Sequence, residues 1–119
     1  SERDAIPQAA DYLATLEGVE TAVVFGIVGD AIQLSGRSTD SRVHVGEVLR
    51  KAFGDVGSAG GHREMAGGEI SLGIFADAAT EGTDLVDIVE RVVTTRLAEA
   101  LNLAEEEGRA DEAAPAEES

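Results

Sequence analysis

The chain has 119 residues, which is enough for one domain and too few for two. It contains no cysteine, and this excludes disulfides, thiolate metal sites and thiol catalysis. No apolar run approaches the ~18 residues of a membrane span, and no basic-then-apolar leader opens the sequence. We therefore expect a cytoplasmic protein that makes no contact with membranes.

Hydrophobic periodicity predicts six elements in the order α-β-β-α-β-α. They are a helix at 5–17, strands at 21–28 and 31–38, a helix at 45–53, a strand at 69–75 and a helix at 84–103. Gly18 ends the first helix, and Gly29-Asp30 forms the turn of a hairpin. This order is typical of a small two-layer α/β or α+β domain whose sheet is covered by helices.

The last part of the chain, residues 104–119, has a different composition. It holds seven acids, one arginine and no large apolar residue. Such a segment cannot bury enough apolar surface to offset the entropy of ordering it. We therefore expect a folded domain over residues 1–103 and a disordered acidic tail over residues 104–119.

The charge is large and unevenly distributed. The formal net charge is −15, from 24 acidic and nine basic residues, and Lys51 is the single lysine. The acids are spread over the whole chain, which predicts adaptation to molar salt in a halophile, with an ordinary acidic protein as the alternative. Residues 35–63 hold five bases against three acids, a net charge of +2. This local excess predicts an anion-binding site, and internal salt bridges are the competing explanation.

A glycine-rich segment at 57–68 carries His62 and Arg63 between pairs of glycines. Glycine lets a ligand approach the backbone closely, and exposed N–H groups can form an anion nest. We expect this segment to be a loop between the second helix and the third strand, with a loose connector as the alternative. Near the end of the second strand, Arg37 suits bidentate phosphate binding, although an arginine there also suits a surface salt bridge.

The sequence contains no complete active site. No Lys-Ser/Thr pair follows the glycines, so a P-loop is excluded, and Ser58 has Val56 where a nucleophile elbow needs glycine. The two histidines, His44 and His62, form no recognisable metal-ligand spacing with the acids. We therefore expect no cofactor in this chain.

Three short runs resemble a known family. They are Ser35-Gly36-Arg37-Ser38, Gly60-Gly61-His62 and Met65-Ala66-Gly67. Together they resemble the DHH-associated C-terminal domain (type one) of DHH phosphoesterases, of the RecJ-like and nanoRNase-like kind, over roughly residues 5–75. Ala59 departs from the usual glycine triplet, and Met65 replaces the usual alanine. The substrate-binding residues implied by this resemblance are Ser35, Arg37, Ser38, Gly60, Gly61, His62, Ala66 and Gly67.

In that family a separate N-terminal DHH domain binds two manganese ions, and the associated domain binds the nucleotide or oligonucleotide. The resemblance implies a substrate-binding domain of a manganese-dependent hydrolase, not catalytic by itself. Its ligand would be short single-stranded RNA or a small phosphorylated nucleotide, and a cyclic dinucleotide or polyphosphate would also fit. The charge of −15 argues against duplex DNA. The alternatives are a nucleotide-sensing or regulatory module and a structural dimerisation domain, and a homodimer is left open.

Overall fold

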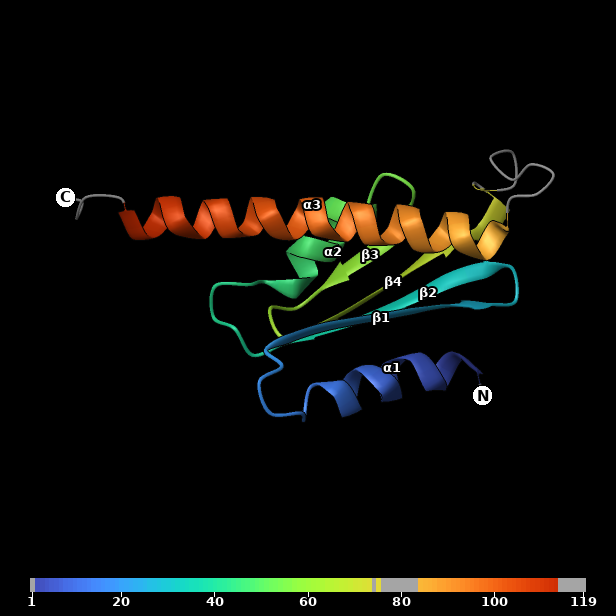
Figure 1. The fold of residues 1–119 in the computed structure, drawn as a ribbon, viewed down its shortest axis with the longest axis horizontal. Helices are drawn as coiled ribbons and strands as arrows, with labels where there is room; N and C mark the ends of the chain where they lie inside the picture. Colours follow the sequence, from blue (N-terminus) through green and yellow to red (C-terminus); the bar gives the residue numbers. More distant parts are fainter. Residues whose placement is uncertain (1, 74, 76–83, 114–119) are drawn as a thin grey trace.

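The computed structural model describes residues 2–73, 75 and 84–113, which form three helices and four strands (Figure 1). In chain order these are α1 (Glu2–Leu13), β1 (Thr21–Val28), β2 (Ala31–Ser38), α2 (Val45–Phe53), β3 (Gly57–Gly61), β4 (Met65–Ser71) and α3 (Leu85–Ala113). The predicted class, a small α+β domain with helices covering its sheet, is confirmed, but the helices lie on both faces of the sheet and not in the single second layer that was predicted. The structure adds one strand, β3, to the predicted order.

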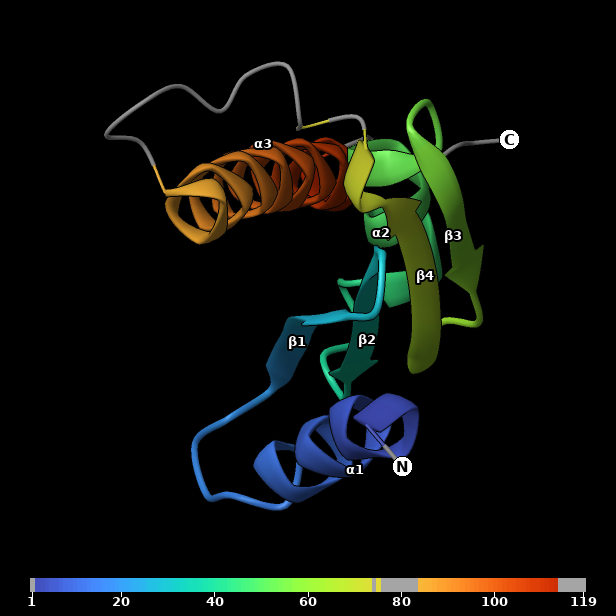
Figure 2. The same ribbon diagram turned by 90° about the vertical axis from the view of Figure 1, so that its right-hand side faces the viewer.

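The four strands form one antiparallel sheet in the order β1-β2-β4-β3. Helix α1 lies on one face, against β1 and β2, and helix α2 lies on the other, against β2, β4 and β3 (Figure 2). A glycine allows each helix to pack closely on its face of the sheet. Gly26 of β1 faces Ile6 of α1, and Gly36 of β2 faces Val45 of α2. Helix α3 packs beside α2. The strands β2 and β4 are therefore central, and β1 and β3 are the edges.

The hydrophobic core lies between the sheet and the helices α2 and α3. Among the described residues, α2 is the most deeply buried of the three helices, and its apolar residues recur along the side that faces the core. Phe53 is its largest buried side chain, at 1% exposure. The largest fully buried side chains are Phe53, Ile32, Leu49, Ile70, Val45, Val48 and Val93.

The prediction of one glycine-rich loop over residues 57–68 is wrong. Residues 57–61 form β3 and residues 65–71 form β4, with a tight turn at 62–64 between them. Sequence analysis missed β3 and the start of β4 because glycine has a low strand propensity and these glycine-rich runs contain no alternation of apolar and polar residues. The predicted third strand at 69–75 therefore begins too late, and Phe75 lies beyond the strand end, where it is buried in the core.

Two helices also differ from their predicted limits. Helix α1 begins at Glu2 and ends at Leu13, with Pro7 inside it. Helix α3 continues to Ala113, so residues 104–113 are helical where a disordered tail was predicted. Alanine and glutamate favour helix, and Lys51 Nζ lies 2.8 Å from Glu107 Oε1, which ties the extension to α2. Residues 114–119 of the predicted tail lie outside the described residues. No described helix is both long and apolar enough to cross a membrane.

The first turn of α2 is held by the β3–β4 turn. Val45 N–H donates to the Arg63 carbonyl at 2.9 Å, and Gly46 N–H donates to the His62 carbonyl at 3.0 Å. His44 is the N-cap, and its Nδ1 accepts from Glu47 N–H at 3.1 Å. Gly46 makes this docking close, because a Cβ there would lie 2.9 Å from the His62 carbonyl oxygen and would also meet the Gly61 carbonyl group.

At the other end of α2, Arg96 of α3 holds the last turn. Its Nη1 donates to the Ala52 carbonyl and to Asp55 Oδ1, each at 2.8 Å. The first contact satisfies a carbonyl that the helix leaves without an internal partner. The second holds the pKa of the Asp55 carboxyl below its ordinary value of 3.8, because Arg96 hydrogen-bonds its charged form.

Replacing Gly46 with alanine tests the docking of α2. In an unconstrained helix this change stabilises by up to about 1 kcal/mol. Here the added methyl would press against backbone atoms of Gly61 and His62, so we expect Gly46→Ala to destabilise the chain by about 1–3 kcal/mol. Urea unfolding monitored by circular dichroism measures the change. A variant as stable as the wild type would contradict the close contact.

Replacing Asp55 with asparagine tests the ion pair with Arg96. Because the folded-state pKa of Asp55 is lowered, its carboxylate stabilises the fold fully above pH 3.8. This contribution is lost as the pH falls through the folded-state pKa. We expect Asp55→Asn to be less stable than the wild type at pH 7, and the difference to shrink below about pH 4. Urea unfolding at low salt across this range measures it, and a pH-independent difference would exclude the pair as its cause.

Candidate functional site

The structure brings the two motif-bearing segments together in one sheet. In the register of β2 and β4, Arg37 pairs with Met65 and Ser35 pairs with Gly67. On the next strand, Gly60 of β3 pairs with the same Gly67. Ser35, Gly67 and Gly60 therefore form one row across three strands, with Arg37 and Met65 in the row beside it.

Seven of the eight implied site residues lie on strands and divide between the two faces of the sheet, and the eighth, His62, lies in a turn. Side chains alternate along a strand, and Arg37, Ser35, Gly67 and Gly60 belong to the face on which α1 lies. Because α1 contacts β1 and β2, this face stays open over β4 and β3. We call this region, together with the β2 residues that border it, the open sheet face, and define it by Gln33, Ser35, Arg37, Ser58, Gly60, Met65, Gly67 and Glu69. Of these residues, Ser35 is buried, at 7% exposure.

The remaining strand residues of the implied set lie on the opposite face. Ala66 is 7% exposed and belongs to the core, and Gly61 is its register partner. Ser38 is buried, where its hydroxyl contacts Thr21 Oγ1 at 2.9 Å and accepts from Asp40 N–H at 3.1 Å. The sheet therefore lies between these three residues and the open sheet face, and the binding role that the resemblance implies for them stays a prediction.

His62 lies in the turn between β3 and β4 with an exposed side chain. Its N–H donates to the Met65 carbonyl at 2.8 Å, and its carbonyl accepts from Gly46. The first amides of α2 are also taken up, since Val45, Gly46 and Glu47 all donate to partners within the chain. Neither the turn amide of His62 nor this helix terminus is therefore available for an anion, and side chains must supply most of the contacts.

Arg37 is held at the border between α1 and the open sheet face. Its side chain is 11% exposed, its Nε donates to Asp11 Oδ1 at 2.7 Å, and its Nη1 donates to the Gly36 carbonyl at 2.8 Å. The salt bridge that the sequence left open therefore exists. Within the described part of the chain Nη2 has no hydrogen-bond partner, so one end of the guanidinium can still meet an anion.

Internal ion pairs account for most of the positive charge of residues 35–63. The pairs are Arg37–Asp11, Arg42–Asp40, Arg50–Glu47 and Lys51–Glu107. Hydrogen bonds from Arg42 and Arg50 hold the pKa values of Asp40 and Glu47 below their ordinary range. The exception is Arg63, which donates to the Ser41 carbonyl at 3.2 Å and has no carboxylate partner among the described residues. Arg63 stands next to His62 in the turn and was not among the implied site residues.

The open sheet face also carries a second polar row, which sequence analysis did not predict. Gln33, Glu69 and Ser58 are register partners on β2, β4 and β3, and Gln33 Nε2 donates to Glu69 Oε1 at 2.8 Å. A pocket of about 510 Å³ opens beside this row, lined by Asp30, Ala31, Ser58, Glu69 and Ser71. Its residues could not be grouped in advance, because β3 and the start of β4 were expected to be a loop.

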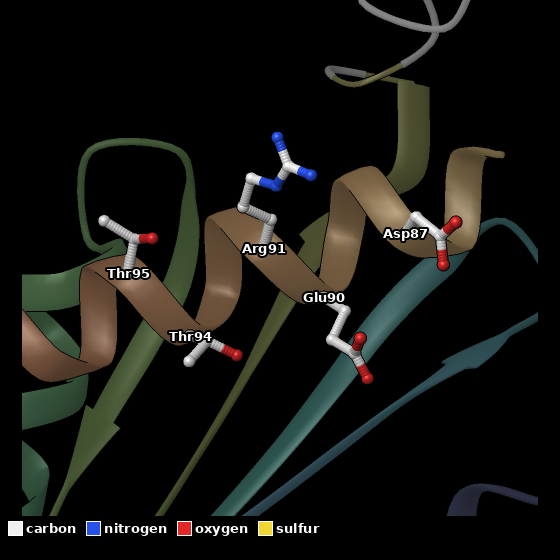
Figure 3. A pocket seen from close by; sticks show the side chains of 5 residues that line it. All are labelled: Asp87, Glu90, Arg91, Thr94 and Thr95. Carbon is white, nitrogen blue, oxygen red and sulfur yellow. The ribbon is translucent and has the colours of Figure 1, made fainter. Parts of the chain in front are cut away.

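Other polar pockets of the described structure lie along α3. Across residues 2–73, 75 and 84–113, no three His, Cys, Asp or Glu side chains come together as a metal site. A pocket on α3 is lined by Asp87, Glu90, Arg91, Thr94 and Thr95. Figure 3 shows that these side chains leave a single helix in different directions, with Glu90 and Arg91 on opposite sides. They do not converge on a ligand.

Comparisons with known proteins agree with this description. Residues 1–95 match the DHHA1 domain. An uncharacterized protein of Methanocaldococcus jannaschii is 45% identical over 107 residues, which cover 90% of this chain and 21% of that protein. The chain thus spans about a fifth of the length of this relative.

The fold also resembles a solved structure, the C-Ala domain of alanyl-tRNA synthetase from Aquifex aeolicus. The TM-score is 0.51 at 21% identity, and the match covers 78% of this chain and 82% of that chain. This likeness supports the α+β architecture alone. Because the family match spans most of the chain and includes every implied site residue, the chain belongs to the DHHA1 family, the C-terminal domains associated with DHH phosphoesterases.

Proposed function

We propose that this chain is the substrate-binding domain of a DHH phosphoesterase and that its open sheet face binds the phosphate of a nucleotide or a short single-stranded RNA. DHHA1 domains are associated with DHH phosphoesterases and with nucleotide or RNA binding. One observation carries the proposal. The sheet register places Arg37 and Ser35 of β2 beside Gly67 of β4 and Gly60 of β3, although these segments are far apart in the sequence.

The shape of this row suits a bulky anion. Gly60 and Gly67 have no side chains, and a Cβ at Gly60 would have no atom within 4 Å, so the space above the strand is open. Gly60 also has a φ of +152°, a conformation that other residues rarely adopt. Phosphate oxygens could therefore approach the backbone there. Two side chains next to this row carry donors. One is Arg37, through Nη2, and the other is the exposed His62, whose backbone N–H donates to the carbonyl of Met65, the register partner of Arg37.

The electrostatics favour a short ligand over a long one. The chain carries −15 in total, and the cations near the row are few. An anion must also share Arg37 with Asp11. We propose further that the chain works in molar salt, as its composition predicts, where charges are screened beyond ~3 Å. Direct hydrogen bonds then supply the affinity, and a long duplex finds no basic face.

In this proposal a separate DHH domain supplies the hydrolytic chemistry. Manganese bound in that domain would activate the attacking water, and the described residues of this chain bring together no ligand set for a metal. The role of the open sheet face is to hold the phosphate and fix its orientation. By itself the chain is then a binding domain.

Removing Arg37 tests the proposal. We expect Arg37→Ala to weaken binding of 5′-AMP by about 1.5–3 kcal/mol, which is the usual contribution of a hydrogen bond to a charged group. Isothermal titration at 50 mM salt measures the affinity. Arg91→Ala is the matched control, since it removes the same charge from α3, on the other side of the sheet. Equal affinities of the two variants would contradict the role of Arg37.

Removing Asp11 tests the competition for Arg37. Asp11 is 61% exposed and pairs with Arg37 at 2.7 Å, so an incoming phosphate must displace or share this contact. An exposed pair contributes about 0.2–1 kcal/mol. We therefore expect Asp11→Asn to bind 5′-AMP about two- to fivefold more tightly than the wild type. Glu17→Gln, at an exposed position after α1, controls for the loss of one negative charge. Weaker binding by Asp11→Asn would show instead that Asp11 holds Arg37 in its binding position.

A further inference from the structure

A polar pocket lies beside the row formed by Ser35, Gly67 and Gly60, and the proposed function gives it no role. It is lined by Asp30, Ala31, Ser58, Glu69 and Ser71. Ser58 and Glu69 are each two residues along their strands from Gly60 and Gly67 and face the same side of the sheet. Two residues of a strand span about 7 Å. A ligand whose phosphate lies on the glycines would therefore extend into this pocket.

The pocket offers hydrogen-bond acceptors in fixed positions. Gln33 Nε2 donates to Glu69 Oε1 at 2.8 Å, which orients the carboxylate, and the Ser58 hydroxyl lies on the neighbouring strand. An ionised carboxylate only accepts hydrogen bonds, and a hydroxyl can accept or donate. Asp30 and Glu69 repel a second phosphate from this pocket. The complementary group is a hydrogen-bond donor, and in a nucleotide the donors nearest to the phosphate are the sugar hydroxyls.

We propose that Glu69, oriented by Gln33, accepts a hydrogen bond from a ribose hydroxyl of the nucleotide whose phosphate lies on Gly60 and Gly67. Carboxylates bind ribose hydroxyls in the same manner in dinucleotide-binding folds. The 2′-hydroxyl is the group by which a protein distinguishes RNA from DNA. The pocket would therefore select ribonucleotides over deoxyribonucleotides. This inference rests on the proposed function and adds the sugar to it.

The test compares two ligands that differ in the sugar alone. Isothermal titration of the 119-residue chain with the 5′-phosphorylated dinucleotide pApA and with its 2′-deoxy counterpart gives two affinities. We expect the wild type to bind the ribonucleotide at least about tenfold more tightly, the effect of losing one hydrogen bond to a charged group. In Glu69→Ala this ratio should fall to about one.

Glu90→Ala is the matched control, because it removes the same charge from an exposed position on α3. It should keep the preference for the ribonucleotide. Glu69→Gln keeps an oxygen for Gln33 and should also lower the ratio, and it replaces Glu69→Ala if that variant does not fold. Loss of the preference in both Glu69 and Glu90 variants would assign it to overall charge and overturn the role of Glu69.

The outcomes separate this inference from the proposed function. Equal binding of both ligands by the wild type would overturn the sugar contact and leave the phosphate site in place. A preference that survives in Glu69→Ala and Glu69→Gln would also overturn it. Failure of both ligands to bind would overturn the proposed function, and this inference with it.

Discussion

The junction between the start of α2 and the β3–β4 turn holds the rest of the structure in place. Gly46 and Val45 donate their N–H groups to carbonyls of the turn, and the missing side chain of Gly46 allows the close approach. The same turn is tied to β2, since Ser38 N–H donates to the Glu64 carbonyl at 3.1 Å. Helix α2, the β3–β4 hairpin and the central strand β2 thus meet at this turn. The strand β3 contributes no large side chain, and its contacts with these neighbours hold it in place.

The central strands serve the core and the site at once. Along β2, Ile32 and Leu34 are buried in the core, and their neighbours Gln33 and Ser35 belong to the open sheet face. Because side chains alternate, a register slip of one residue would exchange the two sets. The position of Arg37 beside Gly67 therefore depends on the packing beneath it. Substitutions in the core can be expected to change the site without contacting a ligand.

Sequence analysis predicts the limits of helices and strands best where the apolar residues follow a clear pattern. β1, β2 and α2 match their predicted ranges residue for residue. The apolar positions of β2 alternate, those of α2 recur at helical spacing, and β1 is dense in β-branched and apolar residues. β3 has the sequence Gly-Ser-Ala-Gly-Gly, which has no apolar pattern, so its hydrogen bonds to β4 could not be foreseen. Because residues 57–68 are expected to form a loop, sequence analysis could not place the side chains of Ala66 and Gly67 on opposite faces of a strand.

Sequence analysis also could not predict contacts between residues that are far apart in the chain. The sequence suggested a role for Arg37, but its ion pair joins it to Asp11, a residue on a different element, and no local pattern announces this contact. Family resemblance supplied the names of the implied residues. The strand register was needed to show that four of them share a face and that Ser38, Gly61 and Ala66 do not.

The make-up of β3 has a consequence for local stability. β3 is an edge strand of small residues that pairs with β4 alone, so its opening exposes little apolar surface and costs less than global unfolding. We therefore expect β3 to open before the central strands and before the core beneath α2. A ligand that binds only the closed strand stabilises it by a free energy that rises with the logarithm of the ligand concentration once this exceeds the Kd. Amide hydrogen exchange of β3 would consequently slow as the site fills, while exchange in α2 stays the same.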